Sequence, residues 1–104
     1  MIRVSVHYPG KPGAKFDHAY YKDKHIPMVK SRLGGLGLVR CEIDRGVSGG
    51  APGSAAPYTC IGYLYFNSVD EFGKAMGAHG KEIMADVPNY TDIKPEVQIS
   101  EIVG

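Results

Sequence analysis

The chain has 104 residues and a formal net charge of +1, from 12 Lys and Arg against 11 Asp and Glu. That length supports one compact domain over residues 1–104, and the near-zero charge argues against a nucleic-acid partner, which requires a clustered basic excess. No apolar run is long enough to cross a membrane and no secretory signal is visible, so we expect a cytoplasmic protein. Cys41 and Cys60 are then expected to be thiols.

The first predicted element is a strand over residues 2–8, in which apolar and polar side chains alternate. A helix is predicted from Asp17, a suitable N-cap, to Leu33, where two glycines end it. Pro27 lies inside this helix and removes a backbone donor, which predicts a kink or a break. Helical spacing predicts a core stripe made of Phe16, Ala19, Tyr20, Ile26, Val29 and Leu33.

Three further strands and a second helix follow. The strands are predicted at 36–45, 58–66 and 95–103, and a Gly-, Ala- and Pro-rich connection joins the first two. Ser68 and Glu71 form a capping box that opens the helix. Its apolar stripe is predicted to contain Val69, Phe72, Met76, His79 and Ile83. The order β-α-β-β-α-β is that of a ferredoxin-like α+β sandwich, a four-stranded antiparallel sheet with both helices on one face.

The pairing of the two middle strands determines where the cysteines lie. A hairpin centred on the segment 49–51 would place Cys41 directly opposite Cys60. Direct cross-strand disulfides are usually strained, so the sequence predicts a reduced pair that packs together.

Two helices would cover one face of this sheet and leave the other face open. The strand at 58–66 offers the open face an apolar or aromatic row, whichever way the strand is turned. A large exposed apolar patch marks an interface, so we expect a homodimer formed through the open face. Tyr63 and Tyr65 are candidate residues of this interface or of a ligand cleft. The alternative is a monomer whose open sheet face is polar and solvated.

The densest group of polar and aromatic residues lies in the first predicted helix. Asp17, Tyr21, His25 and Met28 fall on a face next to the core stripe, each about one turn from the next. Tyr21 and His25 can therefore share a hydrogen bond or contact one ligand. A histidine can move a proton near neutral pH, and a nearby tyrosine can donate a hydrogen bond.

The alternative is a histidine at the rim of the helix that is satisfied by a carbonyl group or by water. An enclosed pocket reached by both His25 and a tyrosine hydroxyl would favour catalysis. A His25 ring capped by a backbone carbonyl and shut off from any cavity would exclude it.

Metal and cofactor sites are not predicted. His18 and His25 lie two helical turns apart, which is too far for one ion, and no Cys or His pair has the spacing of a zinc site. The glycines at 34–37 follow a helix instead of opening one, so they form neither a phosphate loop nor a dinucleotide fingerprint. We therefore expect neither a metal nor a cofactor.

The first predicted helix also carries the motif Phe16-Asp17-x-x-Tyr20-Tyr21-x-x-x-His25-x-Pro27-Met28-Val29. It is accompanied by Tyr8-Pro9, by Asp86-Val87-Pro88-Asn89-Tyr90-Thr91, and by Pro95 before Gln98-Ile99-Ser100. With these motifs the chain resembles the EthD family of the dimeric α+β-barrel superfamily, nearly from end to end. The resemblance implies a ferredoxin-like fold that dimerises into an α+β barrel. It also implies a pocket with His25 at its polar centre and with Asp17, Tyr21 and Tyr90 as candidate neighbours.

Members of this family are associated with bacterial degradation of ethers and similar small organic compounds, often beside an oxygenase system, and are often labelled oxidoreductases. Some relatives act as dehydratases or cyclases.

The resemblance favours a homodimer that binds a small apolar organic compound in a catabolic or oxidoreductive pathway. As an enzyme it would use cofactor-independent acid/base chemistry, with His25 and Tyr21 as catalytic residues. Asp17, Met28, Tyr63, Tyr65 and Tyr90 would be substrate-binding. The alternative is a non-catalytic accessory or binding module that supports an oxygenase system.

Overall fold

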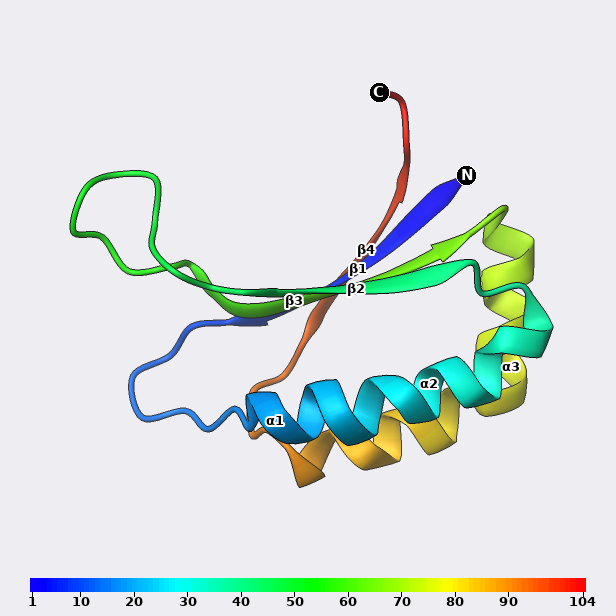
Figure 1. The fold of residues 1–104 in the computed structure, drawn as a ribbon, viewed down its shortest axis with the longest axis horizontal. Helices are drawn as coiled ribbons and strands as arrows, with labels where there is room; N and C mark the ends of the chain where they lie inside the picture. The colour runs from blue at the N-terminus through cyan, green and yellow to red at the C-terminus, as the bar shows by residue number, and fades with distance from the viewer.

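The computed structural model describes residues 1–104 and contains one four-stranded antiparallel sheet. Its strands are β1 (Ile2–Pro9), β2 (Arg40–Arg45), β3 (Tyr58–Phe66) and β4 (Glu96–Glu101). They lie in the order β2-β3-β1-β4, which places the first and third strands at the centre of the sheet. Figure 1 shows both long helical segments on the same face of this sheet. The predicted ferredoxin-like α+β sandwich is therefore confirmed.

Two helical segments cover the sheet. The first is continuous through α1 (His18–Tyr20), the π-helical turn η1 (Tyr21–His25) and α2 (Ile26–Leu33), and is followed by the 3₁₀ turn η2 (Gly34–Leu36). The second consists of α3 (Val69–Asp86) and the 3₁₀ turn η3 (Val87–Asn89). Both predicted N-caps are confirmed, because the Asp17 and Ser68 side chains accept backbone N–H groups three residues later. None of the helices combines the length and the apolar character that crossing a bilayer requires.

Pro27 changes the first helical segment without ending it. The N–H of Ile26, just before the proline, donates to the carbonyl of Tyr21 five residues back, which is the bond of a π turn. The wider turn adds one residue, so Tyr21 is brought into line with Ile26 on the face that meets the sheet. Tyr21 and His25 are consequently only 3% and 4% exposed, whereas Ala19, predicted in the core stripe, is exposed. The predicted kink or break is realised as a change of helical register.

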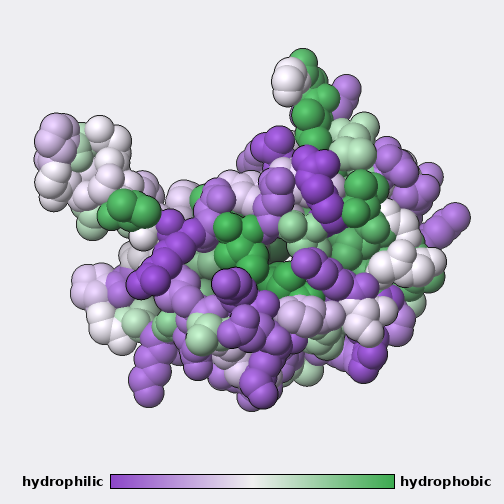
Figure 2. Space-filling model, in the orientation of Figure 1, coloured by the Kyte–Doolittle hydropathy of each residue, from purple (hydrophilic) through white to green (hydrophobic).

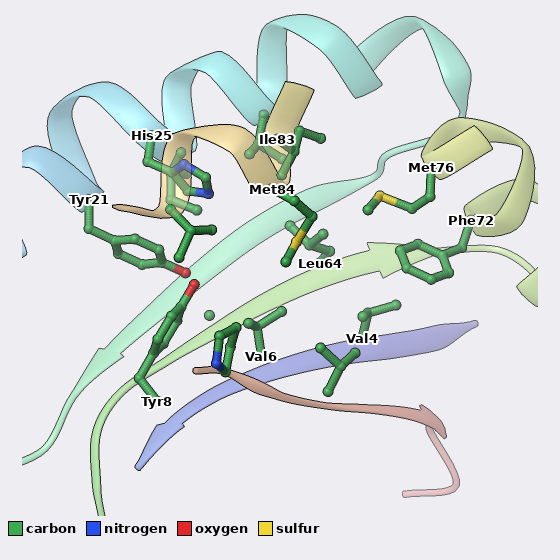
Figure 3. Close-up of a pocket in the computed structure, with 16 residues that line it drawn as sticks. Val4, Val6, Tyr8, Tyr21, His25, Leu64, Phe72, Met76, Ile83 and Met84 are labelled. Carbon is green, nitrogen blue, oxygen red and sulfur yellow. The ribbon is translucent and has the colours of Figure 1, made fainter. Parts of the chain in front are cut away.

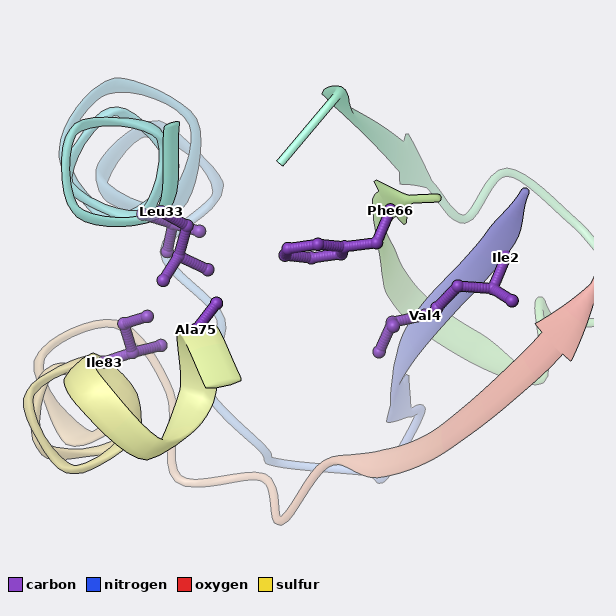
Figure 4. Close-up of a cluster of buried hydrophobic side chains, with 7 residues drawn as sticks. Ile2, Val4, Leu33, Phe66, Ala75 and Ile83 are labelled. Atoms are coloured by element: carbon purple, nitrogen blue, oxygen red, sulfur yellow. The ribbon is translucent and has the colours of Figure 1, made fainter. Parts of the chain in front are cut away.

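The core lies between the helices and the sheet and consists of two clusters. The first, which we call the hydrocarbon cluster, contains Ile2, Val4, Val29, Leu33, Phe66, Ala75 and Ile83 (Figure 4). The second, which we call the tyrosine cluster, contains Tyr8, Tyr21, Ile26, Cys60, Tyr90 and Ile93. Figure 2 shows apolar side chains in the gap between the sheet and the helices, with hydrophilic side chains around them. The chemistry of the core therefore differs between its two ends.

Two residues of the predicted apolar stripe on α3 do not belong to this core. Val69 is 52% exposed at the start of the helix. His79 is only partly buried, and its Nδ1 lies 3.2 Å from Oε1 of Glu82. An imidazole beside a carboxylate and water keeps polar partners that a hydrocarbon interior would not supply.

The register of the β2–β3 hairpin differs from the prediction, and the predicted cysteine pair is wrong. Cys41 lies opposite Leu64, and Cys60 lies opposite Arg45. The turn is centred on Pro52 and Gly53, where Ser54 N–H donates to the carbonyl of Ala51 and Gly53 has φ +77°. Proline followed by glycine at the centre of a turn is the signature of type II geometry, which the prediction overlooked. Both thiols are free, and burial raises the pKa of Cys41 to about 11 and that of Cys60 to about 12.

Candidate functional site

A cavity of about 90 Å³ lies between the helices and the sheet. Of its 16 lining residues 13 are hydrophobic, and they come from β1, β3, β4 and both helical segments. His25 and Tyr21 of η1 and Tyr8 of β1 contribute the polar groups at one end (Figure 3). An apolar enclosure with a few convergent polar groups is the usual composition of a small-molecule site.

His25 is held by a carboxylate from the other helical segment. Its Nδ1 lies 2.8 Å from Oδ2 of Asp86, the last residue of α3. The other oxygen of Asp86 accepts hydrogen bonds from the Tyr20 hydroxyl at 2.7 Å and from the Asn89 amide at 2.9 Å. A carboxylate on Nδ1 favours the tautomer with its proton there, which leaves Nε2 as the basic nitrogen for a ligand.

The charge of Asp86 is maintained by these donors. Burial alone would raise the pKa of Asp86, but the hydrogen bonds from Tyr20, Asn89 and His25 outweigh it, and the pKa lies below its ordinary value of 3.8. Asp86 therefore remains ionised at neutral pH.

This lowered pKa predicts how stability depends on pH. Because the unfolded chain binds a proton at Asp86 more readily than the folded chain, ionised Asp86 stabilises the fold above pH 3.8, and that stabilisation is lost as the pH falls further. We expect the free energy of unfolding, measured in urea between pH 2 and 6 (roughly the carboxylate range), to fall less steeply in acid for Asp86→Asn than for the wild type. Asp23→Asn, on the exposed side of η1, is the matched control and should retain the wild-type slope.

Two tyrosine rings pack against the imidazole, and a third tyrosine, Tyr8, packs against those two rings. The Tyr21 ring lies nearly parallel to that of His25, with centroids 5.4 Å apart, and the Tyr90 ring lies 4.7 Å away. The Tyr8 and Tyr90 hydroxyls are hydrogen-bonded at 2.6 Å, and Figure 3 shows the Tyr8 and Tyr21 hydroxyls pointing toward each other. Burial is the main cause that raises the pKa of all three phenols. They therefore stay protonated at neutral pH and serve as hydrogen-bond donors.

The position of the Tyr21 hydroxyl depends on a glycine in the sheet. Gly62 of β3 faces this hydroxyl, and a Cβ atom at position 62 would overlap it. The absence of a side chain at this point of the strand therefore creates the space in which the phenol reaches the cavity.

Five of the predicted site residues do not line the cavity, and one of these, Tyr90, packs against the rings of Tyr21 and His25 that do line it. Asp17 is exposed and caps α1, and Met28 packs against the hydrocarbon cluster from a surface groove. Tyr63 and Tyr65 lie on the opposite face of the sheet, where their hydroxyls donate to Asp44 and Glu42 at 2.9 and 2.6 Å. Because Gly62 and Leu64 face the helices, alternation along β3 turns both tyrosines away.

The structure thus brings His25, Tyr21 and Tyr90 together and adds two residues that the sequence reasoning did not assign to the site. Asp86 lay within a motif already noted, and Tyr8 ended the first strand. A carboxylate in a conspicuous Asp-Val-Pro-Asn-Tyr segment was the available signal for Asp86. No three His, Cys, Asp or Glu side chains converge in an arrangement that could hold a metal ion.

Comparisons with known proteins agree with this fold. The family model described as "EthD domain" matches residues 13–94. An EthD-like protein from Ralstonia eutropha is 45% identical, with a TM-score of 0.93 over 99% of this chain and 92% of that chain. An ethyl tert-butyl ether D family protein from Bacillus halodurans is 18% identical, with a TM-score of 0.75 over 99% of both chains. SnoaB, a cofactor-independent oxygenase from Streptomyces nogalater, shares the fold at 10% identity and a TM-score of 0.67, over 99% of this chain and 93% of that chain. No curated protein matches the chain.

Proposed function

Because this chain belongs to the EthD family, we propose that it binds a small, largely apolar organic compound in its cavity and transfers a proton with His25. The observation that carries the proposal is the Asp86–His25 pair at the wall of an otherwise apolar cavity. A histidine in apolar surroundings, with its Nδ1 held by a carboxylate, suits general acid/base catalysis, since water cannot compete for the proton. We assign such a reaction to a catabolic or oxidoreductive pathway.

In the proposed step, Nε2 of His25 removes a proton from a carbon next to a carbonyl group of the substrate. The electron pair of the broken C–H bond then forms an enolate, whose oxygen accepts a hydrogen bond from the Tyr21 hydroxyl. Asp86 stays ionised and stabilises the imidazolium that results. The imidazolium returns the proton to carbon in an isomerisation, or to a departing hydroxide in a dehydration.

Hydrogen–deuterium exchange tests this step without knowledge of the natural substrate. We expect the protein in D₂O to accelerate exchange at the carbon beside the carbonyl of small 2-alkanones, followed by proton NMR, relative to buffer with the same concentration of lysozyme. Binding of the ketones without exchange would contradict the catalytic proposal and favour a non-catalytic accessory module that supports an oxygenase system. If no small apolar probe binds, both the catalytic proposal and the accessory-module alternative are contradicted.

A second candidate reaction follows from the same intermediate. An enolate is electron-rich and can react with dioxygen directly, and SnoaB, which shares the fold, is described as a cofactor-independent oxygenase. Oxygen consumption that depends on added substrate, measured with an oxygen electrode, would favour this reaction. Exchange without oxygen consumption would favour isomerisation or dehydration.

We also propose that the protein is a homodimer formed through the open face of the sheet. This face carries Ile61 and Tyr63 only partly covered, with the Arg3 guanidinium 5.7 Å from the Tyr63 ring centroid. Nε of Arg3 and Nδ1 of His7 are buried there without a hydrogen-bond partner. A second sheet packed on this face would cover the apolar groups and could supply acceptors for these nitrogens.

The oligomeric state provides the test. We expect a dimer by size-exclusion chromatography with light scattering, and we expect Ile61→Asp to convert it to a monomer, because a carboxylate would be buried at the interface. Val69→Asp, on the exposed side of α3, is the matched control and should remain dimeric. A monomeric wild type, or a dimeric Ile61→Asp variant, would contradict the assignment of this face.

A further inference from the structure

The cavity has two chemically different ends because it lies where the two core clusters meet. Tyr8, Tyr21 and His25 line one end, and all three bear polar atoms. The opposite end is lined by Val4, Phe72, Met76 and other apolar side chains. Figure 3 shows the two groups at opposite sides of the cavity, with Tyr8 and Val4 on the same strand. Four residues along a strand span about 13 Å.

No side chain could serve a polar group at the second end. Val4 belongs to the hydrocarbon cluster, and Phe72 and Met76 pack against that cluster. A hydroxyl or carbonyl placed there would lose its hydrogen bonds to water without replacement, whereas a methylene group would gain from leaving water. An oxygen-bearing group is therefore confined to the end with His25 and the tyrosines.

The charge of the lining restricts that oxygen-bearing group further. No lysine or arginine lines the cavity, and its one basic side chain, His25, is already paired with Asp86. A carboxylate or phosphate would thus lose its hydration without gaining a free cation, and it would lie near the carboxylate of Asp86.

We propose that the ligand is a neutral amphiphile, with one hydroxyl, carbonyl or ether group at the His25 end and a hydrocarbon tail that extends to Phe72 and Met76. This inference rests on the proposed function and names the substrate class of the same site. Phe72 and Met76 then determine the longest tail that fits. A methionine is suited to this role because its flexible thioether adapts to tails of different shape.

The tail length is bounded by α3, which also borders the mouth of the cavity. Met84 of α3 and Val97 of β4 both line the cavity yet are 53% and 59% exposed, so the cavity reaches the surface between these two side chains. Met76 lies two turns before Met84 and is half-buried. Shortening Met76 should therefore lengthen the apolar end without altering either the mouth or the polar end.

A homologous series measures these features directly. We expect 2-alkanones to displace the neutral dye N-phenyl-1-naphthylamine with a Kd that falls about fourfold for each added methylene and then stops falling when the tail reaches Met76. Alkanoates of the same length should bind at least about tenfold more weakly at pH 8 because of the cost of burying their charge. Met76→Ala should move the break in the series to longer ketones.

Met28→Ala is the matched control, because Met28 is equally half-buried but lies outside the cavity, and it should leave the break unchanged. Phe72→Leu, which also widens the apolar end, replaces Met76→Ala if that variant does not fold. A Kd independent of chain length, equal binding of alkanoates, or the same break in the Met28 and cavity variants would overturn the inference.

The proposed proton transfer can fail separately. Chain-length-dependent binding of ketones without deuterium exchange would contradict the catalytic step and support this inference. Deuterium exchange in short ketones, with no effect of tail length on binding, would support the catalytic step and contradict this inference.

Discussion

Replacing His25 with glutamine is expected to slow deuterium exchange in bound 2-alkanones by about a hundredfold to ten-thousandfold, the usual contribution of a positioned acid or base. The glutamine amide can still donate to Asp86, so the helices stay connected, but no atom of the side chain can accept and return a proton. The rate is measured by proton NMR at saturating ketone, so that a change in affinity does not imitate a change in rate.

Two further variants make this result specific. His79→Gln removes an imidazole that bonds to Glu82 outside the cavity, and it should leave the exchange rate unchanged. Asp86→Asn retains His25 but removes the negative charge that favours the imidazolium, so we expect a slower rate together with a changed pH profile. An exchange rate in His25→Gln close to that of the wild type would show that another group is the base.

The second large effect is expected from a methyl group added inside the sheet. Gly62→Ala places a Cβ against the Tyr21 hydroxyl, and the phenol is enclosed by Tyr8, His25 and Tyr90, so it has little room to move. Overpacking of this kind costs about 1–3 kcal/mol, which corresponds to a fall in Tm of roughly 4–8 °C per kcal/mol for a domain of this size. Calorimetry at fixed protein concentration measures the shift.

A Gly→Ala substitution on α3 should raise the stability instead of lowering it. A Cβ at Gly73 meets no atom within 4 Å, and this glycine is exposed inside a helix, so Gly73→Ala should raise the stability by roughly 0.5–1 kcal/mol. In a Tyr21→Phe background the clashing oxygen is absent, and Gly62→Ala should then cost markedly less than it does alone. Equal costs in the two backgrounds would mean that the Tyr21 hydroxyl is not what occupies the space beside Gly62.

The topology was predictable because it depends on local signals. Alternating strands, two N-caps and the order of the elements each follow from residues that are close in the sequence, and the structure contains all of them. The π turn was not predictable from the ordinary helical period, because a period of 3.6 residues assigns Tyr21 to the rim. Only the wider turn before Pro27 brings Tyr21 into the core.

The site was predictable only in its helical part. His25 and Tyr21 are one turn apart, so their proximity follows from helical geometry. The partner of His25 lies 61 residues away, and helical or strand spacing says nothing about a contact across that distance. The position of Tyr63 and Tyr65 on the other face of the sheet has another cause. The sequence left open which side of β3 faces the helices, and the presence of Gly62 and Leu64 on that side settles it.

The hydrogen bond between Tyr8 and Tyr90 joins two residues that are 82 positions apart. Closing so long a loop costs chain entropy. Contacts of this kind slow folding, because this entropy is lost before the contact contributes any stabilisation. The residues around His25 therefore come from both ends of the polypeptide, and a nascent chain lacks part of the site until Asp86 and Tyr90 have been added. The site around His25 is therefore completed late in synthesis.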